Sequence, residues 1–132
     1  MIIGSMIRGT TVAGTHRRDL DVYLDDPPTN PGWIALGIRV SVKNKARAEI
    51  WVKPADLIAL VGALPNGTDV TSLEGFNQND RPRVLDVRSD PDAKWVQLAV
   101  RVPTNTQAEG DIRVERADLG AAIGALLKQS SL

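Results

Sequence analysis

Apolar and polar residues alternate over positions 33–42, in the sequence WIALGIRVSV. This alternation is typical of a strand with one buried face, and the face predicted to point inward carries Ile34, Leu36, Ile38, Val40 and Val42. The pattern recurs in WVQLAVRV at 95–102. Shorter alternating runs occur in LDVYL (20–24), AEIWVK (48–53), LDV (85–87) and DIRVE (111–115). The pattern therefore predicts three strands in each half of the chain.

The apolar period becomes helical after the third predicted strand of each half. Four apolar residues recur at helical spacing in the first half, and four equivalent residues repeat them in the second. They are Leu57, Leu60, Val61 and Leu64, and Leu119, Ala122, Ile123 and Leu126. Pro54 suits a first helical position, and Asp56 and Asp118 lie in the first turn, where the helix dipole favours a carboxylate. Each half thus predicts the order β-β-β-α.

The two halves are copies of each other. A shift of 62 residues aligns 33–64 with 95–126 without a gap, and fourteen of these 32 positions are identical. The segment RDLDVYLDDP at 18–27 then matches RVLDVRSDP at 83–91. A three-stranded sheet with one short helix is marginally stable alone, so we expect the two units to share one core.

These observations predict an α+β fold. It consists of an internally duplicated β-β-β-α unit with pseudo-two-fold symmetry, in which antiparallel sheets carry the helices on one face. Residues 65–82 are rich in Asn, Asp, Gly and Pro and are interpreted as a linker. The predicted organisation is a single domain over 1–132, with a first unit at 18–64, the linker at 65–82 and a second unit at 83–127. The N-terminal arm 1–17 holds an edge strand or is a loose segment, and both alternatives stay open.

Composition narrows the functional classes. Sixteen basic and sixteen acidic residues leave no net charge, so a nucleic acid or an anionic membrane would need a local patch. The sequence has no cysteine, which excludes disulfides and thiolate chemistry and makes the cytoplasm the expected location. The apolar run MIIGSMI is far shorter than the ~20 residues that span a bilayer, so no membrane partner is expected.

The sequence carries no catalytic motif. His16 is the only histidine and cannot form a multi-histidine metal site alone. The carboxylates of DD and DPD stand beside prolines in ordinary turn sequences, and those of DLD lie at the start of the first predicted strand. Neither a Walker loop nor a nucleophile elbow is present. We therefore predict a protein that is not an enzyme, with no catalytic residue, no cofactor and no metal ligand.

The outward positions of the predicted strands carry aromatic and cationic side chains. These candidate binding residues are Tyr23, Trp33, Arg39, Trp51 and Lys53 in the first unit, and Trp95, Arg101 and Arg113 in the second. A turn centred near Lys45 would place Arg39 opposite Trp51 and, in the copy, Arg101 opposite Arg113. Asp86, Asp111 or a bound anion should then neutralise the second pair.

Two interpretations of this outer face stay open. It contacts a partner, by stacking bases or by gripping a protein, or it is an ordinary polar face with salt bridges or a face covered by a second sheet. The aromatic residues of the first unit are expected to be covered by a partner, a second copy of the chain or the N-terminal arm, because large apolar area is rarely left in water.

The passages AEIWVKPADLIALVGAL and GDIRVERADLGAAIGALL resemble small uncharacterised α+β proteins of actinobacteria and their phages. The resemblance implies a source and no activity. From the residues themselves we predict a non-catalytic binding or adaptor protein that acts on an unknown protein partner or as a homodimer. The alternative is nucleic-acid binding through the Trp/Arg sheet face, against which the zero net charge argues.

Overall fold

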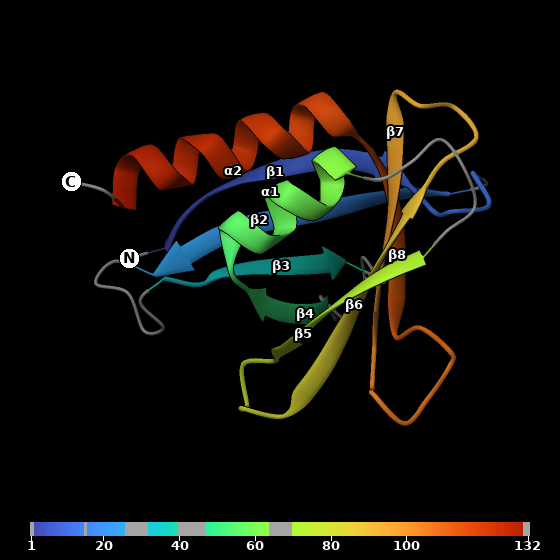
Figure 1. The fold of residues 1–132 in the computed structure, drawn as a ribbon, viewed down its shortest axis with the longest axis horizontal. Coiled ribbons are helices and arrows are strands. Elements are labelled where there is room, and N and C mark those ends of the chain that lie inside the picture. Colours follow the sequence, from blue (N-terminus) through green and yellow to red (C-terminus); the bar gives the residue numbers. More distant parts are fainter. Residues whose placement is uncertain (1, 15, 26–31, 40–46, 64–69, 131–132) are drawn as a thin grey trace.

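The computed structural model describes residues 2–14, 16–25, 32–39, 47–63 and 70–130. These residues form eight antiparallel strands, which follow one another around a closed barrel, and two helices (Figure 1). The first four strands are β1 (Ile2–Thr10), β2 (Arg17–Asp25), β3 (Ile34–Arg39) and β4 (Arg47–Val52), followed by α1 (Pro54–Ala63). The second half comprises β5 (Val70–Phe76), β6 (Pro82–Ser89), β7 (Trp95–Arg101), β8 (Gly110–Glu115) and α2 (Arg116–Ser130).

The predicted α+β fold, with helices on one face of antiparallel sheets, is wrong, because the strands close into a barrel. Of the two alternatives for the N-terminal arm, the structure has the strand, β1. The strand β5 is absent from the prediction, because it lies within the predicted linker 65–82. The inward positions of β5 hold Thr71, Leu73 and Gly75, so this strand shows no run of alternating apolar residues. Each unit therefore has four strands before its helix.

The two copies pair their strands in the same register. In the β3–β4 hairpin Ile34 pairs with Val52, and in the β7–β8 hairpin Val96 pairs with Val114, both 62 positions later. The register itself differs from the predicted one. Arg39 pairs with Arg47, and Trp51 pairs with Ala35, so Arg39 does not lie opposite Trp51 as predicted. The predicted turn lies outside the described residues.

The inward face of β3 is the one that the alternation predicted. Ile34, Leu36 and Ile38 are buried in the barrel, and Leu98 and Val100 of the copy are buried in the same way. The helices add Leu57, Leu119 and Ile123 to this core. Burial of these side chains from both units makes the barrel one hydrophobic core.

The barrel closes at two seams, where the end strands of the two units cross. β4 pairs with β5 only at Trp51 and Phe76, and β8 pairs with β1 only at Arg113 and Thr10. A glycine lies at each crossing. A Cβ atom on Gly75 would collide with the carbonyl oxygen of Trp51, and one on Gly9 with that of Arg113. The two glycines let the strands approach closely enough to close the barrel.

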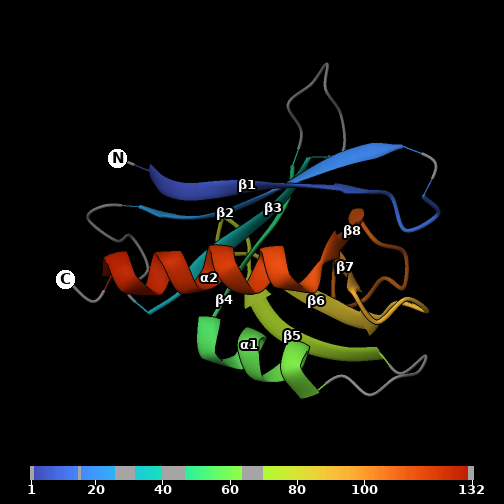
Figure 2. The same cartoon turned by 90° about the horizontal axis from the view of Figure 1, so that it is seen from above.

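Each helix lies beside one seam. α1 begins directly after β4 and contacts β5, whereas α2 begins directly after β8 and runs along β1 (Figure 2). The two helices also contact each other, and both lie on the same side of the barrel (Figure 1). Among the described residues, neither helix is long and apolar enough to cross a membrane.

We expect Gly75→Ala to destabilise the protein, because the added methyl group would meet the backbone of β4. A cost of ~1–3 kcal/mol is typical of such overpacking and can be measured by chemical denaturation. The control is Gly124→Ala in α2, where a Cβ meets nothing within 4 Å and alanine should stabilise the helix by up to ~1 kcal/mol. Equal stability of the two variants would contradict the close crossing at the seam.

Candidate functional site

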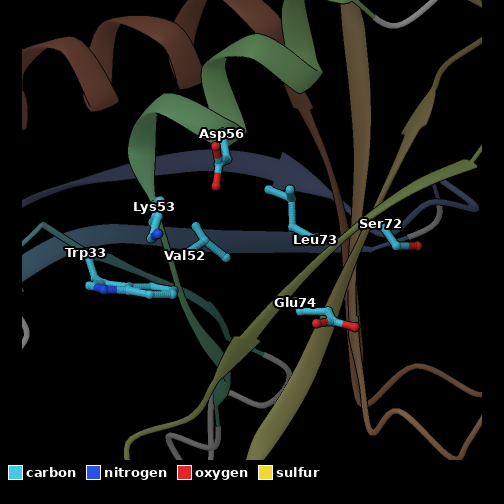
Figure 3. A pocket seen from close by; sticks show the side chains of 7 residues that line it. All are labelled: Trp33, Val52, Lys53, Asp56, Ser72, Leu73 and Glu74. Atoms are coloured by element: carbon cyan, nitrogen blue, oxygen red, sulfur yellow. The ribbon is translucent and has the colours of Figure 1, made fainter.

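A cavity of about 300 Å³ opens beside the β4–β5 seam, below the start of α1 (Figure 3). We call it the β4–β5 groove. It exists because the two strands pair at a single position and are not joined beyond it. Its lining comes from the residue before β3, the end of β4, the first turn of α1 and the middle of β5. The lining residues are Trp33, Val52, Lys53, Asp56, Ser72, Leu73 and Glu74.

The β4–β5 groove combines an indole, apolar side chains and charges of both signs. The ammonium of Lys53 lies 5.5 Å from the centre of the Trp33 ring, a cation–π distance. Figure 3 shows Asp56 pointing from α1 into the space between Lys53 and Leu73, while Glu74 projects from the other side of β5 at the rim. Neither carboxylate makes an ion pair with another described residue. The groove therefore presents to the same space an aromatic ring, apolar side chains and two carboxylates without an ion pair among the described residues.

Two of the predicted binding residues, Tyr23 and Trp51, are buried, with exposed fractions of 8% and 5%. Their rings meet edge to face with centroids 6.0 Å apart. Phe76 of β5 packs against this cluster and lies 5.1 Å from the Trp33 ring. The aromatic face is thus covered in part by a strand of the same chain, which the prediction did not contain. Trp33 stays half-buried at the edge of the cluster and faces the groove.

The predicted outer arginines are each paired with a carboxylate. Arg39 donates two hydrogen bonds to Asp21, at 2.9 and 3.3 Å. The equivalent Arg101 donates to Asp86 at 2.7 Å, which is one of the two neutralising partners that the sequence predicted. Because these cations are already neutralised, they offer little free positive charge to a polyanion.

Arg113 has a different environment from the predicted one. It pairs across the hairpin with Gln97, not with Arg101, and donates hydrogen bonds of 2.8 and 3.0 Å to Asp90. Its guanidinium also lies 4.3 Å from the centre of the Trp95 ring. Hydrogen bonds from Arg113 lower the pKa of Asp90 to about 2, although burial of the carboxyl acts in the opposite direction.

The structure brings together two of the eight predicted residues, Trp33 and Lys53, in one groove. The rest of the lining was not predicted from the sequence. Asp56 carried a signal, since it is identical to Asp118 in the copy, but it was fully explained by helix initiation. The residues of β5 carried none, because that strand was not recognised. Among the described residues no three histidine, cysteine or acidic side chains gather in a way that could hold a metal ion.

An equivalent cavity of about 430 Å³ lies at the other seam, between β1 and α2. We call it the β1–α2 groove. Asp118 lies in this groove where Asp56 lies in the β4–β5 groove. Ile7 lies where Leu73 does, because Ile7 pairs with Leu20 of β2 and Leu73 pairs with the equivalent Leu85 of β6. The lining residues are Ser5, Met6, Ile7, Arg8, Asp118, Ala121, Ala122 and Ala125. The duplication has therefore produced a groove at each seam.

The protein is an internally duplicated, eight-stranded antiparallel barrel with one groove at each seam. The chain is similar to a solved structure described as the plant transcriptional regulator PBF-2, with a TM-score of 0.58. The sequences are 16% identical, and the match covers 98% of this chain and 81% of that one. At this identity the similarity shows the fold alone. No family model and no curated protein matches the sequence, and the resemblance to actinobacterial and phage proteins stays a prediction.

Trp51→Arg copies the arginine that the second unit carries at this position. Because Trp51 is buried, we expect the variant to lose ~3–5 kcal/mol of stability, the range for removing a large buried side chain. Thermal or chemical unfolding measures the loss. Lys53→Glu, which copies Glu115 at an exposed position, is the control and should change stability by less than ~0.5 kcal/mol. A fully stable Trp51→Arg variant would contradict the buried aromatic cluster.

The pair of Asp90 and Arg113 should make stability depend on acidity. The folded pKa of Asp90, about 2, lies below its ordinary 3.8, so its contribution is present above pH ~4 and is lost as the pH falls toward 2. We expect the free energy of unfolding to fall by ~1–2 kcal/mol more in the wild type than in Asp90→Asn over this interval. Asp80→Asn, at an exposed turn, is the control. Parallel pH curves for the wild type and Asp90→Asn would contradict the pairing.

Proposed function

We propose that this protein is a non-catalytic binding protein that holds an extended segment of a protein partner in the β4–β5 groove. The observation that carries the proposal is the edge of β5. This strand pairs with β6 along its length but with β4 only at Phe76, so residues 70–75 keep an edge with no strand partner among the described residues. An extended peptide can add to such an edge and place alternate side chains in the adjoining groove.

The charges around the groove favour a basic segment. Asp56 and Glu74 outnumber Lys53, which lies against the Trp33 ring. A lysine or arginine of the partner would meet Asp56, and an apolar neighbour would contact Val52 and Leu73. For the location of the protein we propose the cytoplasm, which the absence of cysteine from the sequence supports.

Nucleic-acid binding is the second candidate, and the structural neighbour described as a transcriptional regulator favours it. In this case a base would stack on Trp33 and a phosphate would contact Lys53. The neutral net charge and the paired outer arginines count against it. The two candidates differ in the sign of charge that the ligand presents, which makes them separable by experiment.

The test is a selection from a library of short linear peptides, followed by titration of the wild type, Asp56→Asn and Asp118→Asn. The two variants lose the same first-turn carboxylate from equivalent helices, so any effect on folding is matched. We expect the selected peptides to be rich in lysine and arginine and to bind Asp56→Asn about tenfold more weakly, while Asp118→Asn binds as the wild type does.

Selected peptides that bind both variants equally, or a selection that enriches no sequence, would overturn the proposal. Titration with oligothymidylate covers the second candidate. Salt-sensitive binding that Lys53→Glu abolishes would replace the peptide proposal with nucleic-acid binding at the same groove.

A further inference from the structure

The β1–α2 groove has a strand edge that is open in the same way. β1 pairs with β2 from Ile2 to Thr10, but with β8 only at Thr10. Its remaining edge has no strand partner within the part of the chain that the structure describes. A nine-residue strand with one open edge is a site at which another chain can attach.

This groove carries more exposed apolar surface than its counterpart. Met6 on the strand wall is 46% exposed, and it stands where the β4–β5 groove has Ser72. Ala121 and Ala125 are exposed on the helix wall. An exposed methionine on one wall and two exposed alanines on the other give this groove an apolar contact surface.

The charges of the β1–α2 groove are self-complementary. Arg8 stands on the strand wall and Asp118 on the helix wall, both are exposed, and neither makes an ion pair with another described residue. In a two-fold dimer whose axis runs along the groove, each wall of one copy meets the opposite wall of the other, so each contact occurs twice. Two copies that meet at this groove therefore bring arginine against aspartate on both sides of the axis.

The β4–β5 groove lacks this property. The counterpart of Arg8 there is Glu74, and the counterpart of Asp118 is Asp56. The same two-fold contact at that groove would set carboxylate against carboxylate, which is unfavourable. Of the two grooves created by the duplication, only the β1–α2 groove has charges that suit a second copy of this chain.

We propose that the β1–α2 groove is the interface of a two-fold homodimer, in which Met6 is covered and Arg8 of each copy faces the aspartate at position 118 of the other. The chain has no net charge, so no general repulsion opposes the association. The interface leaves the β4–β5 groove of each copy free, and the dimer would present two such grooves.

Sedimentation velocity of the full chain over a range of concentrations tests the proposal. We expect a wild-type dimer that weakens with salt, and an Arg8→Asp variant whose dissociation constant rises by about tenfold or more. The double variant Arg8→Asp with Asp118→Arg exchanges the two charges and should restore the dimer. Met6→Ser, which copies Ser72, should weaken the dimer without involving charge. Glu74→Arg, at the counterpart of Arg8, is the control and should leave the dimer intact.

Circular dichroism and thermal unfolding establish that each variant is folded. A monomeric wild type, a dimer that persists in both Arg8→Asp and Met6→Ser, or a double variant that stays monomeric would overturn the proposal. The outcome is independent of the peptide experiment, since Arg8→Asp leaves the β4–β5 groove unaltered. A monomer that still selects basic peptides would refute the interface alone.

Discussion

The close crossing of strands at Gly9 and Gly75 is the constraint on which the rest of the structure depends. At both seams one strand passes so near its neighbour that a Cβ atom would collide with a carbonyl oxygen. The crossing brings the two four-stranded units into one barrel and one core. It also limits the pairing of the described strands to a single position at each seam. β1 and β5 therefore keep edges without a strand partner among these residues, and each helix lies beside a groove.

Duplication has produced two grooves of the same construction and different chemistry. Both keep an aspartate in the first turn of the helix and an apolar side chain that points inward from the strand. They differ at the rim, where Glu74 is replaced by Arg8 and Ser72 by Met6. These four positions are exposed and carry no part of the core. One groove therefore carries two carboxylates and a lysine, and the other carries one carboxylate and an arginine.

Sequence patterns predicted the elements whose faces differ sharply in polarity. In β3 and β7 large aliphatic side chains recur at every second position because that face lies in the barrel core, and α1 and α2 follow the helical period for the same reason. β5 was not predicted, because only Leu73 among its inward residues is large and apolar. Without β5, the cover over Tyr23 and Trp51 and most of the lining beside Lys53 could not be predicted. Of the partners of the three outer arginines, Asp86 was identified, whereas Asp21 and Asp90 were not.

By itself the sequence determined the duplication, the identical registers of the two hairpins and the residues that point into the core, because these follow from local periodicity and from repeated residues. Only the tertiary structure decided that the units close into a barrel, that Trp51 is buried while Trp33 borders a groove, and that Lys53 shares this groove with Asp56. The reason is physical. Closure depends on how two distant strands cross at a glycine, and neither periodicity nor composition records which segments meet across that crossing.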